Sequence, residues 1–229
     1  MRFSGLWIKS SCFKMKFYFV RHGESEANVL HVISNRETPY GLTPLGRQQA
    51  STLANSLQNV PITTIFSSPI LRARQTAEIL AGSFHQTYQV TEALREYDCG
   101  ILEDRADEES WRLHREIAQD WTVNQNYLRK PEGGECFLDI RSRFIPFIEE
   151  LTRDGLDRDD HILLVGHGGL FQLMLPLILT NVDIPFAQLH GMGHTETIVA
   201  QREQNGLVCL QWGPVKFEKG YPPKWQDRY

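Results

Sequence analysis

Short apolar runs along the chain are separated by longer stretches in which apolar and polar positions alternate with helical spacing. Lys16-Phe-Tyr-Phe-Val20 is apolar and aromatic throughout and ends at a charged loop, which is typical of a buried strand in an α/β sheet. Comparable runs predict further strands at 61–66, 88–90, 161–165, 197–200 and 207–212.

Helix signals lie between these strands. Thr43-Pro44 provides a cap followed by proline, and the apolar positions after it keep one helical face for about four turns. Ser68-Pro69 repeats this signal and predicts a helix ending near Gly82. Helical spacing also follows Leu138, where Pro146 predicts a kink or an early break, and the apolar stretch 168–179 predicts a buried helix.

Strands alternating with helices predict an α/β fold: a three-layer α/β/α sandwich with a mostly parallel central sheet. We expect one domain over 15–212, interrupted by a helical insertion or lid at 104–135, with tails at 1–14 and 213–229. Met15 directly precedes the first strand, so an alternative start there stays open. No repeat or linker divides the chain.

Composition narrows the function. The 229 residues carry a formal charge of −4, so no global positive field favours nucleic acid or an anionic membrane. The longest apolar stretch is too short to span a bilayer. The four cysteines form no CxxC pair and have no close histidine partners, which indicates neither a zinc site nor a disulfide framework. We expect a cytoplasmic protein, of open oligomeric state, that binds no nucleic acid and no membrane.

Two predicted strands end in histidine-glycine sequences, Arg21-His22-Gly23-Glu24 and Gly166-His167-Gly168-Gly169. Ligand sites in open α/β sheets form at the carboxyl ends of strands, so the two histidines are expected to face one crevice. A single histidine after a strand is more often a turn residue. The pair favours a catalytic function.

The sequence resembles the histidine phosphatase superfamily, also called the phosphoglycerate mutase-like family. The resemblance spans Phe17 to about Trp212. Its ordered blocks are Phe19-Val-Arg-His-Gly-Glu-Ser-Glu-Ala-Asn28, Leu42-Thr43 with Gly46, Ser67-Ser-Pro-Ile-Leu-Arg-Ala-Arg-Gln-Thr76, Leu94-Arg-Glu96 with Gly100, Gly133-Gly-Glu-Cys136 and Val165-Gly-His-Gly168.

The chemistry explains why these residue types are required. A neutral imidazole attacks phosphorus, and water can displace the resulting phosphohistidine; we expect His22 to be this nucleophile. Arg21 and Arg72 are suited to the negative charge that spreads over the phosphoryl oxygens. His167 is expected to complete this group as a protonated donor, while the surrounding positive charge keeps His22 neutral.

The resemblance also implies that Asn28 and Gly168 contribute to phosphate binding and that Glu96 is the acid of the loop after the third strand. Glu96 would protonate the leaving alkoxide oxygen and later help to deprotonate the attacking water. Asp98 and Glu103 are the alternatives. Arg74 is expected on the surface, because it lies two positions from Arg72 on a helix.

The insertion carries tryptophan and basic residues that either shape a substrate lid or form ordinary packing and a solvated face. These residues are Trp111, Arg112, Arg115, Trp121, Arg129 and Lys130. His190 and His194 flank a glycine-rich turn, where either one braces the site or, more simply for His190, serves the turn.

The function expected from these observations is hydrolysis of a phosphomonoester of a small metabolite by a histidine phosphatase. No motif implies a cofactor or a metal. The rivals are a phosphoglycerate mutase and a noncatalytic binding module on the same fold. Mutases typically carry Arg-His-Tyr-Gly after the loop acid, whereas this chain has Tyr97-Asp98-Cys99-Gly100, which favours hydrolysis. Sugar phosphates, phosphoglycerates, nucleotides and phosphoprotein sites all stay open as substrates.

Overall fold

The computed structural model describes residues 15–36, 39–153 and 159–218. Within these ranges, seven strands form one sheet in the order β3-β2-β4-β1-β5-β6-β7. The strands are β1 Lys16–Arg21, β2 Thr64–Ser67, β3 Gln89–Val90, β4 His161–Gly166, β5 Thr197–Glu203, β6 Gly206–Trp212 and β7 Val215–Lys216. Strands β3, β2, β4 and β1 are parallel, and the three later strands extend the sheet in antiparallel fashion. The expected parallel core is confirmed.

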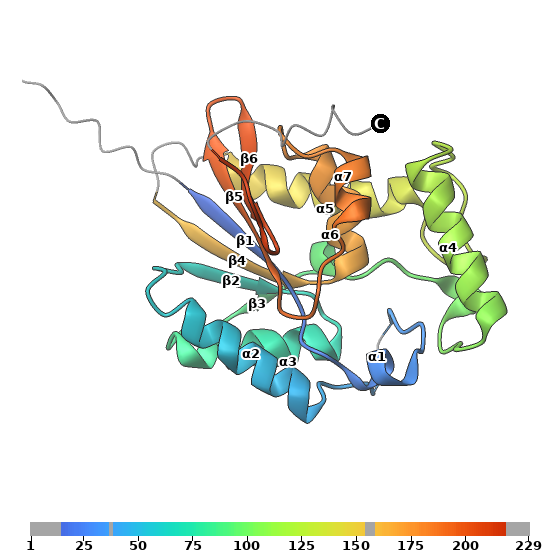
Figure 1. The fold of residues 1–229 in the computed structure, drawn as a ribbon, viewed down its shortest axis with the longest axis horizontal. Helices are drawn as coiled ribbons and strands as arrows, with labels where there is room; N and C mark the ends of the chain where they lie inside the picture. Colours follow the sequence, from blue (N-terminus) through green and yellow to red (C-terminus); the bar gives the residue numbers. More distant parts are fainter. Residues whose placement is uncertain (1–14, 37–38, 154–158, 219–229) are drawn as a thin grey trace, which may run out of the picture.

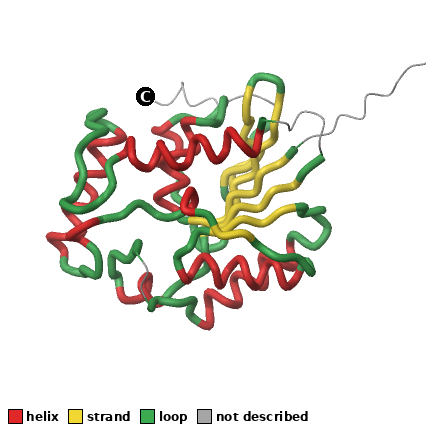
Figure 2. The backbone as a smooth tube through the Cα atoms, turned by 180° about the vertical axis from the view of Figure 1, so that it is seen from behind, coloured by secondary structure: helices red, strands yellow, loops and turns green. Residues whose placement is uncertain are grey.

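Helices cover both faces of the sheet, as the three-layer prediction requires (Figures 1 and 2). Helices α2 and α3 lie on one face, while α5, α6 and α7 lie on the other (Figure 1). The helices are α1 Glu26–Leu30, α2 Pro44–Ser56, α3 Leu71–Ser83, α4 Glu108–Thr122, α5 Phe137–Thr152, α6 Gly168–Met174 and α7 Ile184–Leu189. None of the helices in the described ranges is long and apolar enough to cross a membrane.

Strand β1 shows how the sequence divides the core into two layers. Side chains alternate across a strand, so Phe17 and Phe19 join the cluster under α5 and α6, whereas Tyr18 and Val20 join the cluster under α2 and α3. All four are buried. The apolar run is therefore buried on both sides, as expected for a central strand of a covered sheet.

The two predicted helix caps have different outcomes. Thr43 caps α2 by accepting a hydrogen bond from the Gly46 backbone N–H at 3.0 Å, as predicted. The second cap prediction is wrong, because α3 begins after Ile70, which makes no side-chain cap bond. The Ser68 hydroxyl accepts from the Ile70 backbone N–H at 3.3 Å, before the helix begins, and also bonds to the His167 ring at 2.8 Å.

Prolines mark two further outcomes. Helix α5 continues through Pro146 to Thr152, so the predicted early break does not occur. The stretch 168–179 is not one helix: α6 ends at Met174, and a 3-10 turn with Pro176 follows at Leu175–Leu177.

The chain ends show one correction. The sequence predicted an irregular tail from Gly213, but Val215–Lys216 pairs with β6 as a short seventh strand. Residues 1–14, predicted to be a tail, lie outside the described residues. The insertion predicted at 104–135 contains α4, which projects from the side of the molecule at the carboxyl end of β1 (Figure 1).

Candidate active site

The register of the sheet brings the two histidine-glycine sequences together. Arg21 pairs with Gly166 in the parallel alignment of β1 and β4, so His22 and His167 are adjacent where both strands end. The backbone N–H of His22 donates to the Gly166 carbonyl at 3.0 Å, and the two imidazole ring centres lie 5.1 Å apart. Both side chains are buried, with 3% and 1% exposure.

Close backbone approach holds the loop after His22 in place. A Cβ atom on Gly23 would lie 2.4 Å from the Gly46 carbonyl oxygen, and one on Gly46 would lie 2.0 Å from the Glu24 carbonyl oxygen. Such contacts are too short for any side chain, so both positions require glycine. The Gly23 N–H also donates to the Thr76 hydroxyl at 3.1 Å. The loop is thus fixed to α2 and α3.

Hydrogen bonds fix the orientation of the His22 ring. Its Nδ1 lies 2.7 Å from the Gly23 carbonyl oxygen, which can only accept, so Nδ1 carries the proton. Its Nε2 accepts a hydrogen bond from Nε of Arg72 at 2.9 Å. Burial first, and then the charges of Arg72 and Arg21, hold the pKa of His22 well below its usual range. His22 therefore presents a neutral ring with its lone pair on Nε2.

Arg72 is the central cation of the site. Besides His22, its guanidinium reaches the Ser34 carbonyl at 2.7 Å, the Asn35 side-chain oxygen at 3.4 Å and Nδ1 of His167 at 3.4 Å. Burial lowers the pKa of Arg72 to about 10, so it stays charged at neutral pH. Arg74 is exposed, as predicted.

Arg21 has donor capacity left over. It donates through Nη1 to the Met192 carbonyl, while its buried Nε has no hydrogen-bond partner among the described residues. Burial lowers the pKa of Arg21, with Glu96 and Glu196 acting in the opposite direction. A buried guanidinium with an unused donor is suited to an anionic ligand.

His167 differs from its prediction. Burial first, and then the charges of Arg72, His22 and Arg21, hold the pKa of His167 well below its usual range. Its Nε2 lies 2.8 Å from the Ser68 hydroxyl. The expectation of a protonated His167 is therefore wrong for the site without an anion, because two buried arginine charges face the ring.

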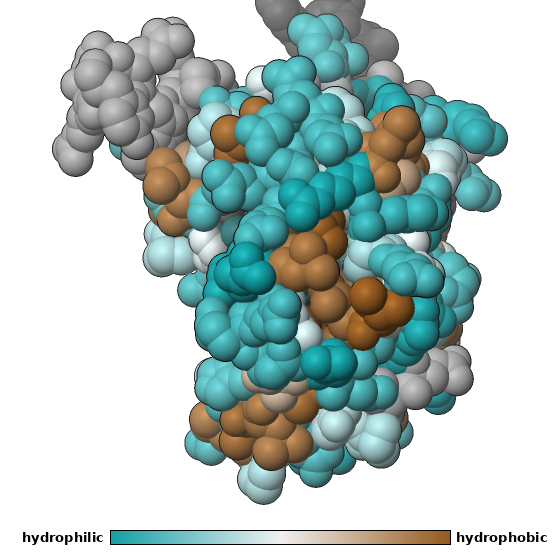
Figure 3. Space-filling view, turned by 90° about the vertical axis from the view of Figure 1, so that its right-hand side faces the viewer, coloured by the Kyte–Doolittle hydropathy of each residue, from teal (hydrophilic) through white to brown (hydrophobic). Residues whose placement is uncertain are grey.

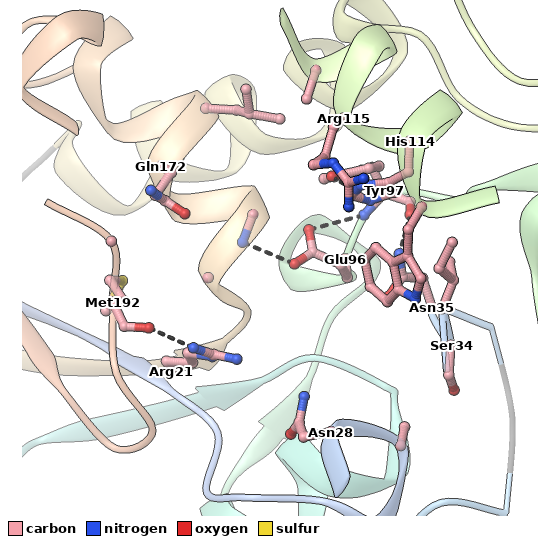
Figure 4. Close-up of a pocket in the computed structure, with 18 of the residues that line it drawn as sticks. Arg21, Asn28, Ser34, Asn35, Glu96, Tyr97, His114, Arg115, Gln172 and Met192 are labelled. Carbon is pink, nitrogen blue, oxygen red and sulfur yellow. Dashed lines mark hydrogen bonds between the residues drawn. The ribbon is translucent and has the colours of Figure 1, made fainter. Parts of the chain in front are cut away.

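Glu96 lies in the loop that follows β3 and is 8% exposed. Its Oε2 accepts from the Gly169 N–H at 3.0 Å, and its Oε1 accepts from the Tyr97 N–H at 3.2 Å (Figure 4). Burial raises the pKa of Glu96 against these two hydrogen bonds and Arg72, which favours the protonated carboxyl. A Cβ atom on Gly169 would lie 2.9 Å from a Glu96 carboxyl oxygen and 2.8 Å from the Tyr97 ring, so a side chain there would displace both groups.

The two alternative acids do not line the same cavity. Asp98 forms an ion pair with Arg36 at 2.9 Å. Glu103 accepts from the Asn35 and Cys99 backbone N–H groups at 2.7 and 2.9 Å. Both carboxylates hold loops, and Glu96 is the one of these three acids that lines the cavity together with His22.

Asn28 contributes to the same wall from α1. Its side-chain oxygen accepts from the backbone and hydroxyl of Ser25 at 3.0 and 2.8 Å, which closes a capping box. The amide nitrogen is turned toward the cavity (Figure 4). Gly168 begins α6 beside Arg21, where a Cβ atom would meet the guanidinium side chain at 3.4 Å.

One cavity of about 860 Å³ at the carboxyl ends of the parallel strands is lined by Arg21, His22, Asn28, Arg72, Glu96 and Gly168. His167 contacts two of these residues, His22 and Arg72. Among the described residues, no three histidine, cysteine, aspartate or glutamate side chains are grouped so that they could hold a metal ion.

The model of the histidine phosphatase superfamily (branch 1) matches residues 17–214, which is most of the chain. The chain belongs to the histidine phosphatase superfamily. The enzyme class and the phosphoglycerate mutase-like fold expected from the sequence are thereby confirmed at the level of the family.

Relatives of this chain carry several activities in their names. It is 31% identical over 167 residues to the adenosylcobalamin/alpha-ribazole phosphatase of Salmonella typhimurium, covering 72% of this chain and 80% of that protein. It is 33% identical over 172 residues to a probable phosphoglycerate mutase of Proteus mirabilis, covering 72% of this chain and 75% of the relative.

It is also 33% identical over 181 residues to the 6-phosphofructo-2-kinase/fructose-2,6-bisphosphatase of Caenorhabditis elegans, of which it spans only 37%, against 75% of this chain. Among solved structures, a mycobacterial glucosyl-3-phosphoglycerate phosphatase superposes with a TM-score of 0.72 at 26% identity. That match covers 87% of this chain and 99% of the other.

One residue that organises the candidate active site was not singled out from the sequence. Arg143 on α5 donates through Nη1 to the carbonyls of Glu92, Ala93 and Arg95 at 3.2, 3.1 and 2.9 Å, and it pairs with Glu135 at 2.9 Å. It therefore holds the segment directly before Glu96. The helical spacing around Leu138 predicts that Arg143 lies on a helix, but it does not indicate which residues Arg143 contacts.

The two histidines that flank the glycine-rich turn have different surroundings. His194 lies with its ring centre 6.2 Å from that of His22. His190 stacks on Phe186 at 4.1 Å and bonds to the Phe186 carbonyl, in keeping with a structural role.

Of the insertion residues proposed for a lid, Trp111 and Arg115 line the cavity. Trp121 is buried and donates to the Arg129 carbonyl, which is packing. The other three make ion pairs: Arg112 with Glu116, Arg129 with Asp120 and Lys130 with Asp139.

Proposed function

We propose that this chain hydrolyses phosphomonoesters of small metabolites in two steps through a phosphohistidine on Nε2 of His22. The observation that carries the proposal is the fixed tautomer of His22. The Gly23 carbonyl holds the proton on Nδ1 at 2.7 Å, so the Nε2 lone pair is directed toward Arg72 and the cavity. A neutral and oriented imidazole is the form that attacks phosphorus.

The phosphoryl group would lie among Arg21, Arg72 and His167, with the amide nitrogen of Asn28 and the backbone at Gly168 completing its surroundings. Two buried guanidinium groups stabilise the negative charge of the transition state more strongly than they would in water. A bound phosphate dianion would also offset the arginine charges that lower the pKa of His167. We therefore expect His167 to gain its proton with the substrate.

Glu96 would supply the proton. In the first step the bond between phosphorus and the ester oxygen breaks, the bond between phosphorus and Nε2 forms, and the alkoxide takes the Glu96 proton. In the second step Glu96 removes a proton from water, whose oxygen displaces His22 from phosphorus. The raised pKa of the buried Glu96 carboxyl suits both tasks.

The experiment is rapid acid and base quenching of the enzyme after mixing with a ³²P-labelled alkyl phosphate. We expect an acid-labile, base-stable phosphoenzyme in the wild type and none in His22→Ala, which should also release no phosphate. His85→Asn, which removes an exposed histidine, is the control and should label normally. Label recovered on serine or aspartate would reject His22 as the nucleophile.

The same samples test the two rival functions. A mutase would return the phosphoryl group to a second hydroxyl of a phosphoglycerate and would release little inorganic phosphate. A noncatalytic module would form no phosphoenzyme. We also expect chelators to leave phosphate release unchanged, because Arg21 and Arg72 supply positive charge at the phosphoryl group. Activity lost to a chelator and restored by a divalent metal would contradict this.

A further inference from the structure

The cavity is larger than a phosphoryl group requires. Its volume of about 860 Å³ falls within the range of sites that enclose whole metabolites. The charged groups described above occupy the end at His22. The remaining lining, here called the distal half, comes from the loop before Arg36, from α4 and from the segments around Gln172 and Met192.

Apolar and uncharged side chains dominate the distal half. Its apolar members include Ile33, Trp111, Ala118, Val123, Leu173 and Met192. His114 is also uncharged at neutral pH, because burial and Arg115 lower its pKa to about 4. Glu96 is the one carboxylate among the described residues that line the cavity.

Arg115 is the distal half's only cation within the described lining, and it already has a partner. Its Nη2 forms an ion pair with Glu108 on the same helix, and both side chains are more than half exposed. A substrate carboxylate would have to compete with Glu108 and with water for this arginine. Such a surface pair contributes little to binding.

Trp111 is held as a rigid wall. Its indole Nε1 donates to the His31 carbonyl at 2.7 Å, and its ring meets His114 edge to face with centres 5.2 Å apart. Nε2 of His114 is in turn hydrogen-bonded to the Tyr97 hydroxyl at 2.9 Å. An aromatic ring fixed before binding loses little conformational entropy when a ligand packs against it.

The wall around α6 provides a neutral hydrogen-bonding group. The side-chain nitrogen of Gln172 donates to the Ala187 carbonyl at 3.0 Å. Its side-chain oxygen faces the cavity, across from Arg115 and His114 (Figure 4). Hydroxyl or amide donors on a ligand could bond to this oxygen without any charge.

We infer that the distal half selects phosphomonoesters whose alcohol part is large, uncharged and partly aromatic, with Trp111 as the residue that determines this preference. The inference rests on the proposed function, since it assigns the alcohol part of the same substrate. Small phosphorylated carboxylic acids are disfavoured, because their carboxylate would leave water for a half-cavity without a free cation among its described residues.

The experiment compares kcat/KM for three alkyl phosphates, so that each leaving group is a basic alkoxide. We expect 2-phenylethyl phosphate to exceed glycerol 3-phosphate by about 10- to 100-fold, from burial and aromatic packing of its ring. We expect 3-phosphoglycerate to fall about 10-fold below glycerol 3-phosphate. A preference for 3-phosphoglycerate that disappears in Arg115→Gln would overturn the inference and assign Arg115 to carboxylate recognition.

Variants of α4 locate the preference. Trp111→Ala should lower the ratio of kcat/KM for phenylethyl phosphate to that for glycerol phosphate about 10-fold. Arg112→Ala, its exposed neighbour outside the cavity, should leave the ratio unchanged. Ala118→Phe, which narrows the cavity without removing Trp111, should lower the same ratio. An unchanged ratio in both Trp111→Ala and Ala118→Phe would also overturn the inference.

Calorimetric binding of the three esters to His22→Ala separates this inference from the proposed function. If the wild type releases phosphate from none of the three esters but binding to His22→Ala follows the expected order, the proposed function fails and the distal half is as inferred. If phosphate is released but turnover and binding both rank 3-phosphoglycerate first, the inference fails while the proposed function stands.

Discussion

The two ends of the cavity are built in different ways. At the histidine end, His22 and His167 come from the ends of β1 and β4, and both bond to Arg72 of α3. Glu96 comes from the loop after β3, and all four side chains are at most 8% exposed. The distal half depends largely on α4, whose ion pairs lie in solvent and whose surroundings mix apolar and hydrophilic groups over that side of the molecule (Figure 3). The sheet thus fixes the groups proposed for chemistry, while a projecting helix supplies the groups proposed for selectivity.

The histidine end should therefore respond to single-atom changes that the distal half would tolerate. We expect Glu96→Gln to lower kcat/KM for alkyl phosphates by about 10²- to 10⁴-fold, because the amide cannot protonate an alkoxide. The loss for p-nitrophenyl phosphate should be smaller, since its leaving group is a stabilised anion. Steady-state kcat/KM is the measurement, because it covers binding through formation of phosphohistidine and excludes the later water step.

Asp98→Asn is the matched control, since Asp98 lies in the same loop but pairs with Arg36 outside the cavity. It should leave the ratio between the two substrates unchanged. An equal loss for both leaving groups in Glu96→Gln would make Glu96 a structural or phosphate-positioning residue and would return attention to Asp98 and Glu103.

Arg72→Lys should lower kcat/KM by about 10²- to 10³-fold for every phosphomonoester, because an ammonium cannot reproduce the planar set of contacts that Arg72 makes. Arg74→Lys changes the exposed arginine two positions away on the same helix and should leave kcat/KM within about twofold of the wild type. Assays with nitrophenyl phosphate at several phosphate concentrations give both kcat/KM and the inhibition constant of phosphate. Equal effects of the two variants would place the phosphoryl group elsewhere.

Arg143 provides a milder test, because its hydrogen bonds reach the histidine end through the loop before Glu96. We expect Arg143→Lys to lower kcat/KM for alkyl phosphates by roughly 10-fold, with a smaller loss for nitrophenyl phosphate, since the displaced acid matters most for a basic leaving group. Arg141→Lys, exposed on the same helix, is the control. A loss that ignores the leaving group would show that Arg143 supports only folding.

The sequence was most informative where local signals and strand register coincide. His22 and His167 follow apolar runs that end at the same edge of a parallel sheet, so their adjacency followed from the strands alone. Arg72 was placed correctly as well, because α3 begins directly after β2, next to β4. Each of these three residues lies within a few positions of the end of a strand, so the strand determines where it is placed.

Long-range partners could not be predicted in this way. Ser68 reads locally as a helix cap, yet its hydroxyl bonds to His167 across 99 residues. The lowered pKa of His167 in the site without an anion was not foreseen, because burial against two arginines is a property of the packed site. Helix α4 was expected, but its pattern does not say which side chains enter a cavity, so Trp111 and Trp121 looked alike before the fold was known.

Both ends of the cavity should contribute to the pH dependence of stability. Burial and Arg115 lower the pKa of His114 to about 4, whereas an unfolded histidine titrates near 6.5. Between these values the unfolded chain binds a proton at this site that the folded chain does not, so the free energy of unfolding decreases as pH falls, by up to about 1.4 kcal/mol per pH unit. His114→Gln keeps an acceptor for the Tyr97 hydroxyl but does not titrate. In urea unfolding between pH 7 and 4, this variant should therefore show a slope of the unfolding free energy against pH that is smaller by up to one proton.

Part of that slope should persist, because the pKa values of His22 and His167 are also lowered by burial. An unchanged slope would mean that His114 accepts a proton inside the fold, and the distal half would then carry a charge at acidic pH. A slope that vanished altogether would mean that the histidine end does not resist protonation, against the neutral His22 on which the proposed chemistry depends.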